Sequence, residues 1–160
     1  MKVKVAIYDT HDKAVNALKV LGKHNFPMDK VSLIGKSDVI DDHIHLKSLD
    51  PVKNSPALIG IGAGSVIGLL SGIGVFTIPG FGFLYGAGAF VGLVGGFNLG
   101  FFAGGLGAVL LKLGIKKDSI VDYEEHLNQG MFIVLINGNE ETVLEAEKIL
   151  HSEGTHLLID

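Results

Sequence analysis

Residues 57–76 read ALIGIGAGSVIGLLSGIGVF, and residues 83–111 read FLYGAGAFVGLVGGFNLGFFAGGLGAVLL. No charged side chain occurs between residues 54 and 111, where most of the 23 glycines lie. A bilayer core of about 30 Å is crossed by roughly 20 apolar residues in helical form, and both runs reach that length. Pro79-Gly80 between them is typical of a tight turn. The sequence therefore predicts a hydrophobic helical hairpin over residues 56–112, with helices at about 57–76 and 83–111.

Glycine recurs at every fourth residue in both runs. At this spacing the missing side chains form a groove along a helix, in which a second helix can approach closely. The strongly polar side chain in the hairpin is Asn98, and such amides commonly hydrogen-bond across helix interfaces. We therefore predict a homo-oligomer. Its predicted helix-packing interface comprises Gly60, Gly64, Gly68, Gly72, Gly88, Gly92, Gly96, Gly100, Gly104 and Asn98.

The first 36 residues show the pattern of strand, helix and strand. Residues 3–9 alternate between apolar and polar side chains, as a half-buried strand does. Apolar residues then recur at helical spacing over 12–25, after Thr10 as a candidate cap. Residues 30–35 predict a second strand. Residues 37–55 are polar and mixed, and we interpret them as a linker to the hairpin.

Residues 113–160 predict a second half of similar design. A helix is expected over 118–129, capped by Asp118 and closed by Gly130. The apolar run 131–137 suits a central strand that is buried on both faces. Asn139 is expected to cap a helix that stops at Gly154, and residues 155–160 complete the chain as a strand.

The predicted fold class is therefore α+β. Strand, helix and strand on each side of the hairpin indicate one ferredoxin-like domain that is split into two βαβ halves, with residues 118–129 as an extra helix. Both halves must emerge on one side of a membrane. Lysines at both ends of the hairpin place that side in the cytoplasm, which predicts an inner-membrane protein with both termini cytoplasmic.

Composition narrows the classes of function. All 13 basic residues are lysine and the net charge is −4, which disfavours nucleic-acid binding. Without cysteine, the chain has no disulfide framework, thiolate nucleophile or thiolate metal site. No set of residues has the spacing of a catalytic site or a nucleotide loop, so we predict no enzyme activity and no cofactor. Weak metal candidates in the linker, where a solvated surface is the favoured interpretation, are Asp41, Asp42, His43 and His45.

Several short motifs are similar to one known family. They are NFPMDKVSLIGK at 25–36, FTIPGFG at 76–82, Leu113-Gly114-Ile115 before an acidic helix that contains Tyr123, and Gln129-Gly130 before the third strand. In this arrangement, which covers nearly the whole chain, the sequence resembles the bacterial general stress protein family with YflT-type halves. The resemblance implies a stress-associated membrane or membrane-like assembly, and it brings no catalytic residues.

Two functional hypotheses follow from these patterns. The first is a membrane-embedded, homo-oligomeric structural or sensing protein that is not an enzyme, with the lipid bilayer as its partner. The alternative is a soluble homo-oligomeric assembly in the cytoplasm, in which packed hydrophobic hairpins enclose or carry a lipid-like ligand. Glycine supplies little apolar area, so burial of the hairpins against one another competes with membrane insertion.

Overall fold

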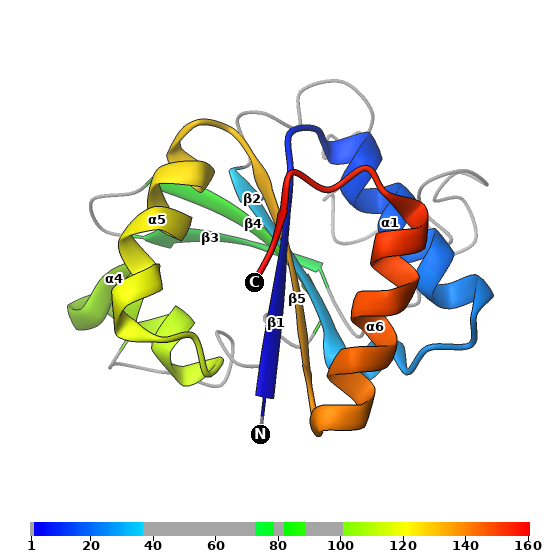
Figure 1. Cartoon of the computed structure of the whole chain (residues 1–160). Helices are drawn as coiled ribbons and strands as arrows, with labels where there is room; N and C mark the ends of the chain where they lie inside the picture. The colour runs from blue at the N-terminus through cyan, green and yellow to red at the C-terminus, as the bar shows by residue number, and fades with distance from the viewer. Residues whose placement is uncertain (1, 37–72, 79–81, 89–100) are drawn as a thin grey trace, which may run out of the picture.

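The computed structural model of the chain describes residues 2–36, 73–78, 82–88 and 101–160. These residues form one sheet with helices on both faces (Figure 1). The strand order is β3-β4-β2-β5-β1-β6, and every neighbouring pair is antiparallel. The α+β prediction is therefore confirmed. The strands are β1 (Lys2–Tyr8), β2 (Val31–Lys36), β3 (Ile73–Ile78), β4 (Gly82–Gly88), β5 (Phe132–Gly138) and β6 (Leu158–Ile159).

Two pairs of helices cover opposite faces of the sheet (Figure 1). One pair is α1 (His11–Lys23) and α6 (Glu140–Glu153), and the other is α4 (Phe101–Lys112) and α5 (Lys117–Asn128). A short 3₁₀ turn, η1 (Met28–Lys30), precedes β2. Successive side chains of β1 alternate between the two layers. Ala6 belongs to the apolar cluster under α1 and α6, whereas Ile7 belongs to the cluster under α4 and α5.

Local signals set the ends of the helices. The Thr10 hydroxyl accepts a hydrogen bond from the Lys13 amide (3.3 Å), and Asn139 Oδ1 accepts one from the Thr142 amide (2.8 Å). Both predicted caps are confirmed. Gly154 ends α6 at a left-handed φ of 73°, as predicted. The prediction of Asp118 as a cap is wrong, because α5 begins at Lys117 and no side chain caps its first turn.

The apolar run that precedes α6 forms the centre of the sheet, as predicted. Each residue of β5 from 132 to 137 is buried. Val134 lies between Ala6 of β1 and Leu33 of β2 in the ladder. Burial on both faces explains why this strand shows no polar alternation.

The described parts of the uncharged segment 54–111 do not form the predicted helical hairpin. Residues 73–78 and 82–88 are the strands β3 and β4, with Val75 opposite Tyr85. β4 in turn pairs with β2, with Gly86 opposite Ile34. Within the predicted second helix, 83–111, the helical part described is α4, and Gly105 interrupts it at φ 62° and ψ −165°.

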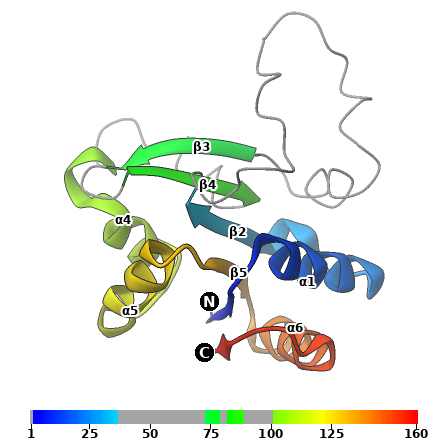
Figure 2. The same cartoon turned by 90° about the horizontal axis from the view of Figure 1, so that it is seen from above.

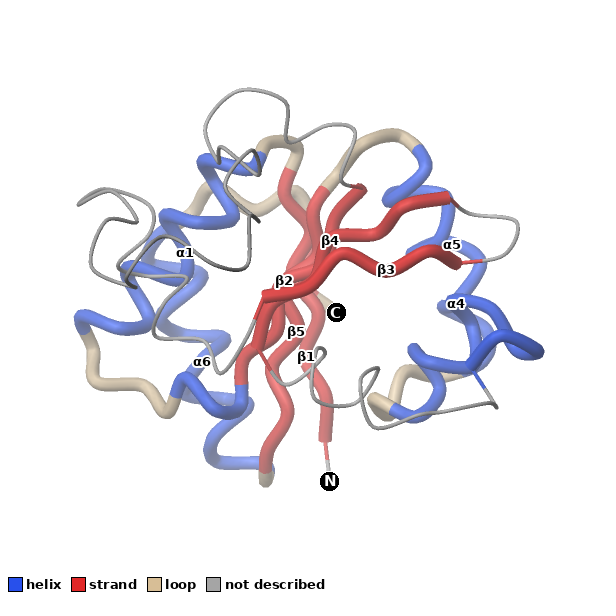
Figure 3. Tube along the Cα trace, turned by 180° about the vertical axis from the view of Figure 1, so that it is seen from behind, coloured by secondary structure: helices blue, strands red, loops and turns tan. Residues whose placement is uncertain are grey.

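A physical reason for this difference lies in the residues themselves. β3 reads IGVFTI and is rich in β-branched side chains, which favour a strand, and glycine is among the weakest helix formers. Figures 2 and 3 show β4 between β3 and β2, where it supplies hydrogen-bond partners that the edge of β2 would otherwise lack. The predicted Pro79-Gly80 turn itself falls outside the described residues.

The membrane prediction also requires correction. Within 2–36, 73–78, 82–88 and 101–160, none of the helices combines the length and the apolarity that a bilayer crossing demands. α4 has 12 residues, whereas a crossing takes about 20. For this part of the chain, the prediction of transmembrane helices is therefore wrong.

Candidate functional site

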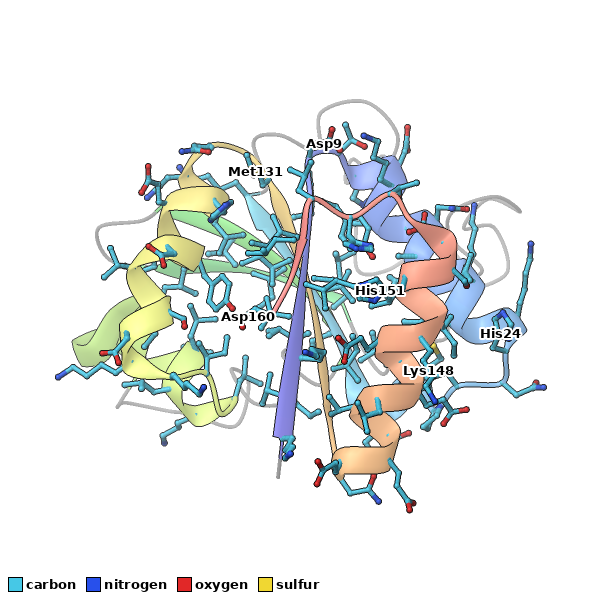
Figure 4. The ribbon with its side chains drawn as sticks, in the orientation of Figure 1. Asp9, His24, Met131, Lys148, His151 and Asp160 are labelled. Carbon is cyan, nitrogen blue, oxygen red and sulfur yellow. The ribbon has the colours of Figure 1, made fainter. Side chains whose placement is uncertain are left out.

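A groove of about 460 Å³ runs beside the first half of β1, between the two helical layers. We call it the β1 groove. Residues 2–5 of β1 line it, α5 and the turn before it form one wall, and the first two turns of α6 form the other. Asp160 lies at one end, between α5 and β1 (Figure 4). The lining residues are Lys2, Val3, Lys4, Val5, Gly114, Ile115, Lys116, Ser119, Tyr123, Glu140, Val143, Leu144, Glu147 and Asp160.

The floor of the groove is an open edge of the sheet. Val5 exchanges two backbone hydrogen bonds of 2.9 Å with Asp160, beside β6. Neighbouring residues of a strand direct their N–H and C=O groups to opposite sides. The N–H and C=O of Val3 therefore point to the β6 side, as those of Val5 do. β6 pairs with Ala6 and Ile7, so no described strand lies beside Val3 on this side.

One wall of the groove is fixed by a hydrogen bond between distant parts of the chain. The Tyr123 hydroxyl on α5 donates to Asp160 Oδ2 over 2.8 Å. The Tyr123 side chain is buried with Ile120 and Leu127 against the sheet. Burial, followed by the hydrogen bond to Asp160, raises the pKa of Tyr123 well above its usual value near 10. The phenol therefore stays protonated and remains a donor at neutral pH.

The opposite wall carries two ion pairs that join β1 to α6. Lys2 Nζ lies 2.9 Å from Glu140 Oε1, and Lys4 Nζ lies 3.4 Å from Glu147 Oε2. The hydrogen bond from Lys2 lowers the pKa of Glu140. The first pair is exposed and contributes little to stability, the second is partly buried, and together they neutralise both acids of this wall. Leu144 stands beside them with 48% of its surface exposed.

The charges of the groove are thus divided unequally between its walls. Lys116, on the α5 side, forms no ion pair within the described part of the chain. The α6 wall combines neutralised pairs with exposed apolar surface. The groove therefore offers a backbone donor and acceptor on its floor, the Lys116 cation and the Asp160 carboxylate on the α5 side, and an apolar surface on the α6 side. This chemistry suits binding of an extended polar chain.

The far edge of the sheet is a second candidate surface. β3 is the outermost strand and pairs on one side, with β4. Its outer side has no partner among the described strands. Its sequence, IGVFTI, contains neither charge nor proline, and such an edge is a template for pairing with another strand.

Most of the predicted site residues lie outside the described part of the chain. This applies to the metal candidates Asp41, Asp42, His43 and His45, and to all the predicted packing positions except two, Gly88 and Gly104. Gly104 lies in α4. Gly88 is not a helix-packing position, because it ends β4 opposite Ser32. It has φ 82°, and a Cβ there would lie 2.2 Å from the Val31 carbonyl oxygen, so close backbone contact explains this glycine.

Three of the histidines make aromatic ring contacts. The His11 ring packs edge-on against Phe132, with centroids 5.3 Å apart, and the His151 and His156 rings make a similar contact at 5.1 Å. In the part of the chain described here, no three His, Cys, Asp or Glu residues converge in a way that could hold a metal. These rings contribute to packing where helix and strand ends meet.

Sequence reasoning missed the β1 groove altogether. Its residues come from both ends of the chain, and only the pairing of β1 with β6 leaves Val3 exposed beside α5 and α6. The one local signal was the pair Lys2 and Lys4 on the same face of an apolar strand. Comparison with known proteins finds no match to a family model, a curated protein or a solved structure.

Proposed function

We propose that this chain is a non-catalytic subunit of a homo-oligomeric assembly. Copies meet along the outer edge of β3. The proposal keeps the homo-oligomer of the sequence-based alternative, but its contact is a strand edge instead of packed helical hairpins. It needs no catalytic group, no metal and no nucleic acid.

The observation that carries the proposal is the contrast between the two edges of the sheet. β3 is six residues long and uncharged. An uncharged edge strand of this kind, with no lysine or proline within it, pairs readily with a second copy of itself. Two identical uncharged strands meet without electrostatic repulsion, and antiparallel pairing about a two-fold axis makes such a contact self-complementary.

The opposite edge has the protection that β3 lacks. β6 is two residues long, and beyond it β1 carries Lys2 and Lys4 in ion pairs with α6. Short edge strands and lysines are common means of preventing edge-to-edge association. A chain that protected itself from all association would be expected to protect both edges. The difference therefore supports a specific contact through β3.

We also propose that the two ends of the chain form a ferredoxin-like domain. Support comes from the order β2-β5-β1-β6, in which α1 connects β1 to β2 and α6 connects β5 to β6. Each connection passes over one intervening strand, as in the split βαβ arrangement. Membership of the general stress protein family with YflT-type halves remains a proposal that rests on the sequence motifs. The lipid-like ligand likewise remains a prediction.

The test is the particle mass of the purified chain in buffer without detergent. Light scattering on a sizing column should give a uniform particle of several chain masses. Val75→Lys and Gly74→Lys place a charge in β3 on opposite faces, so one of the two lysines points away from α4. At least one variant should shift the particle to smaller mass while far-UV circular dichroism retains the α+β spectrum.

Val121→Lys is the matched control, because Val121 is 67% exposed and belongs to α5, not to β3. It should leave the particle mass unchanged. If both β3 variants are folded and keep the wild-type mass, β3 is not the contact. A wild-type chain that is monomeric at micromolar concentration would contradict the proposed assembly itself.

A further inference from the structure

We propose that His151 and His156 form a binding site for one divalent transition-metal ion of the zinc type. Nε2 of His151 and Nδ1 of His156 are its ligands, and water completes the coordination. The site lies at the end of α6 and not at β3, so this inference is independent of the proposed assembly.

The chain reverses its direction between the two histidines. Gly154 ends α6 in the left-handed conformation. The Glu153 carboxylate then accepts hydrogen bonds from both the amide and the hydroxyl of Thr155. These contacts return His156 to the last turn of α6, where its ring and that of His151 lie 5.1 Å apart, centroid to centroid, with 69° between their planes.

Each ring has a nitrogen available to an ion. Nδ1 of His151 lies 2.9 Å from the Glu147 carbonyl oxygen. A carbonyl only accepts hydrogen bonds, so Nδ1 donates the proton and Nε2 of the neutral ring keeps a lone pair. Such a carbonyl contact is also the usual outer support of a metal-bound imidazole. Nδ1 of His156 is buried without a hydrogen-bond partner in the described structure, which costs free energy, and a metal ion would accept its lone pair.

The separation of the rings fits a shared ion. Zn–N bonds are about 2.0–2.1 Å long, so two imidazoles on one tetrahedral ion have ring centroids about 5 Å apart. The separation of 5.1 Å between His151 and His156 agrees with this value. Rotation of the two side chains therefore suffices to direct both nitrogens at one ion, without movement of the backbone.

The charges on the last two turns of α6 do not oppose a cation. Glu147 is paired with Lys4, and Lys148 and Glu153 have opposite charges. The carbonyl end of a helix favours positive charge. Imidazole suits Zn²⁺, Cu²⁺ and Ni²⁺, whereas Mg²⁺ and Ca²⁺ prefer oxygen ligands. No third His, Cys, Asp or Glu side chain converges there among the described residues, so we expect weaker binding than at a zinc centre with four protein ligands.

The experiment is isothermal titration calorimetry of the full chain with Zn²⁺, in a buffer that does not bind metals. His151→Gln and His156→Gln each remove one ligand but keep a polar side chain, and each should weaken zinc binding at least about ten-fold. His126→Gln is the matched control and should bind zinc as the wild type does. Nδ1 of His126 makes the same contact with the carbonyl of Asp122, but its ring has no ring contact with a second histidine among the described residues.

Thermal denaturation separates a metal site from simple packing of the rings. An ion that binds only the folded chain raises the melting temperature. About 1 mM Zn²⁺ should therefore stabilise the wild type and His126→Gln, but neither His151→Gln nor His156→Gln, whatever their melting temperatures without metal. Mg²⁺ should stabilise none of them. If Zn²⁺ leaves the wild-type melting temperature unchanged, the site is overturned.

The linker histidines need a control of their own. The double variant His43→Ala/His45→Ala should keep the wild-type affinity for Zn²⁺. Loss of zinc binding in this variant would assign the ion to the linker and overturn the site at the end of α6. Wild-type zinc affinity in either His151→Gln or His156→Gln would overturn it as well, because two imidazoles are its only protein ligands.

Discussion

The hydroxyl of Tyr123 and the carboxylate of Asp160 lie 2.8 Å apart, and this hydrogen bond joins α5 to the residue that follows β6. The other large buried phenol, Tyr8, has a hydroxyl with no hydrogen-bond partner in the described structure. The two tyrosines belong to opposite apolar layers. They therefore form a natural pair for measuring what one buried hydroxyl contributes.

Tyr123→Phe should destabilise the fold by about 1 kcal/mol, because it removes a hydrogen bond to a carboxylate while keeping the ring. Tyr8→Phe should change the free energy of unfolding by less than about 0.5 kcal/mol, or increase it. Folding removes the Tyr8 hydroxyl from water, and no hydrogen bond in the folded state offsets that cost. Urea denaturation followed by circular dichroism measures both. Equal losses in the two variants would contradict the assignment of partners.

Stability should fall in alkaline solution. Burial is the main cause that raises the pKa of both Tyr8 and Tyr123 above the value near 10 expected in the unfolded chain. Above pH 10 the unfolded state releases these protons and the folded state keeps them, so the free energy of unfolding decreases as pH rises. The stabilisation is complete below pH 10.

The measurement is the urea midpoint between pH 9 and pH 11.5. The wild-type urea midpoint should fall over this pH range. The midpoint of each Tyr→Phe variant should fall less steeply, since one titrating group has been removed. Absorbance at 295 nm should show that these two phenols ionise only together with unfolding. A midpoint independent of pH would contradict the burial of these hydroxyls.

Proline substitutions should reveal which side of β1 is open. The Val3 amide faces the groove, so Val3→Pro removes a donor that no described strand uses. The Lys4 amide faces β5, where Lys4 lies opposite Ile136. Lys4→Pro should therefore cost about 1–3 kcal/mol more than Val3→Pro, because it leaves a buried carbonyl without its donor. Thermal denaturation compares the two.

Lys4→Ala provides the control for this comparison. It removes the partly buried ion pair with Glu147, at 3.4 Å, but keeps the backbone amide, and the expected loss is about 1 kcal/mol. If Val3→Pro were as damaging as Lys4→Pro, the N–H of Val3 would have a partner and the groove would be closed.

Glycine substitutions test the replacement of the predicted helix by β4. Gly88 has φ 82°, and an added Cβ would lie 2.2 Å from the Val31 oxygen. Gly88→Ala should therefore destabilise the fold by more than about 2 kcal/mol. Gly105 has φ 62° and ψ −165°, a conformation that is essentially restricted to glycine, with open space around it, so Gly105→Ala should lose about 1–3 kcal/mol from backbone strain alone. In a helix, Gly88→Ala would instead gain about 1 kcal/mol, and denaturation midpoints distinguish these outcomes.

Much of the fold at both ends of the chain was predictable from the sequence. Hydrophobic periodicity located the strands and helices of residues 2–36 and 117–160, and the caps at Thr10 and Asn139 lie where they were expected. These features depend on interactions within one or two turns of a helix or along one strand. Local residue order contains all the information that such interactions need.

The middle of the chain was predicted less well, for a definite reason. An uncharged apolar run is compatible with a buried helix or a buried strand, and periodicity alone does not separate them. Residues 73–78 and 82–88 became strands where the edge of β2 supplied hydrogen-bond partners. A partner that lies about fifty residues away in the chain leaves no local signature.

The amino-acid sequence by itself determined the α+β class, the terminal strands and helices, and the absence of charge from residues 54–111, because these properties depend on residue type and short spacing. Only the tertiary structure decided that β3 forms an uncharged outer edge and that Val3, Lys116, Leu144 and Asp160 surround one groove. The physical reason is strand pairing, which brings distant residues together and determines which backbone groups are left without a partner.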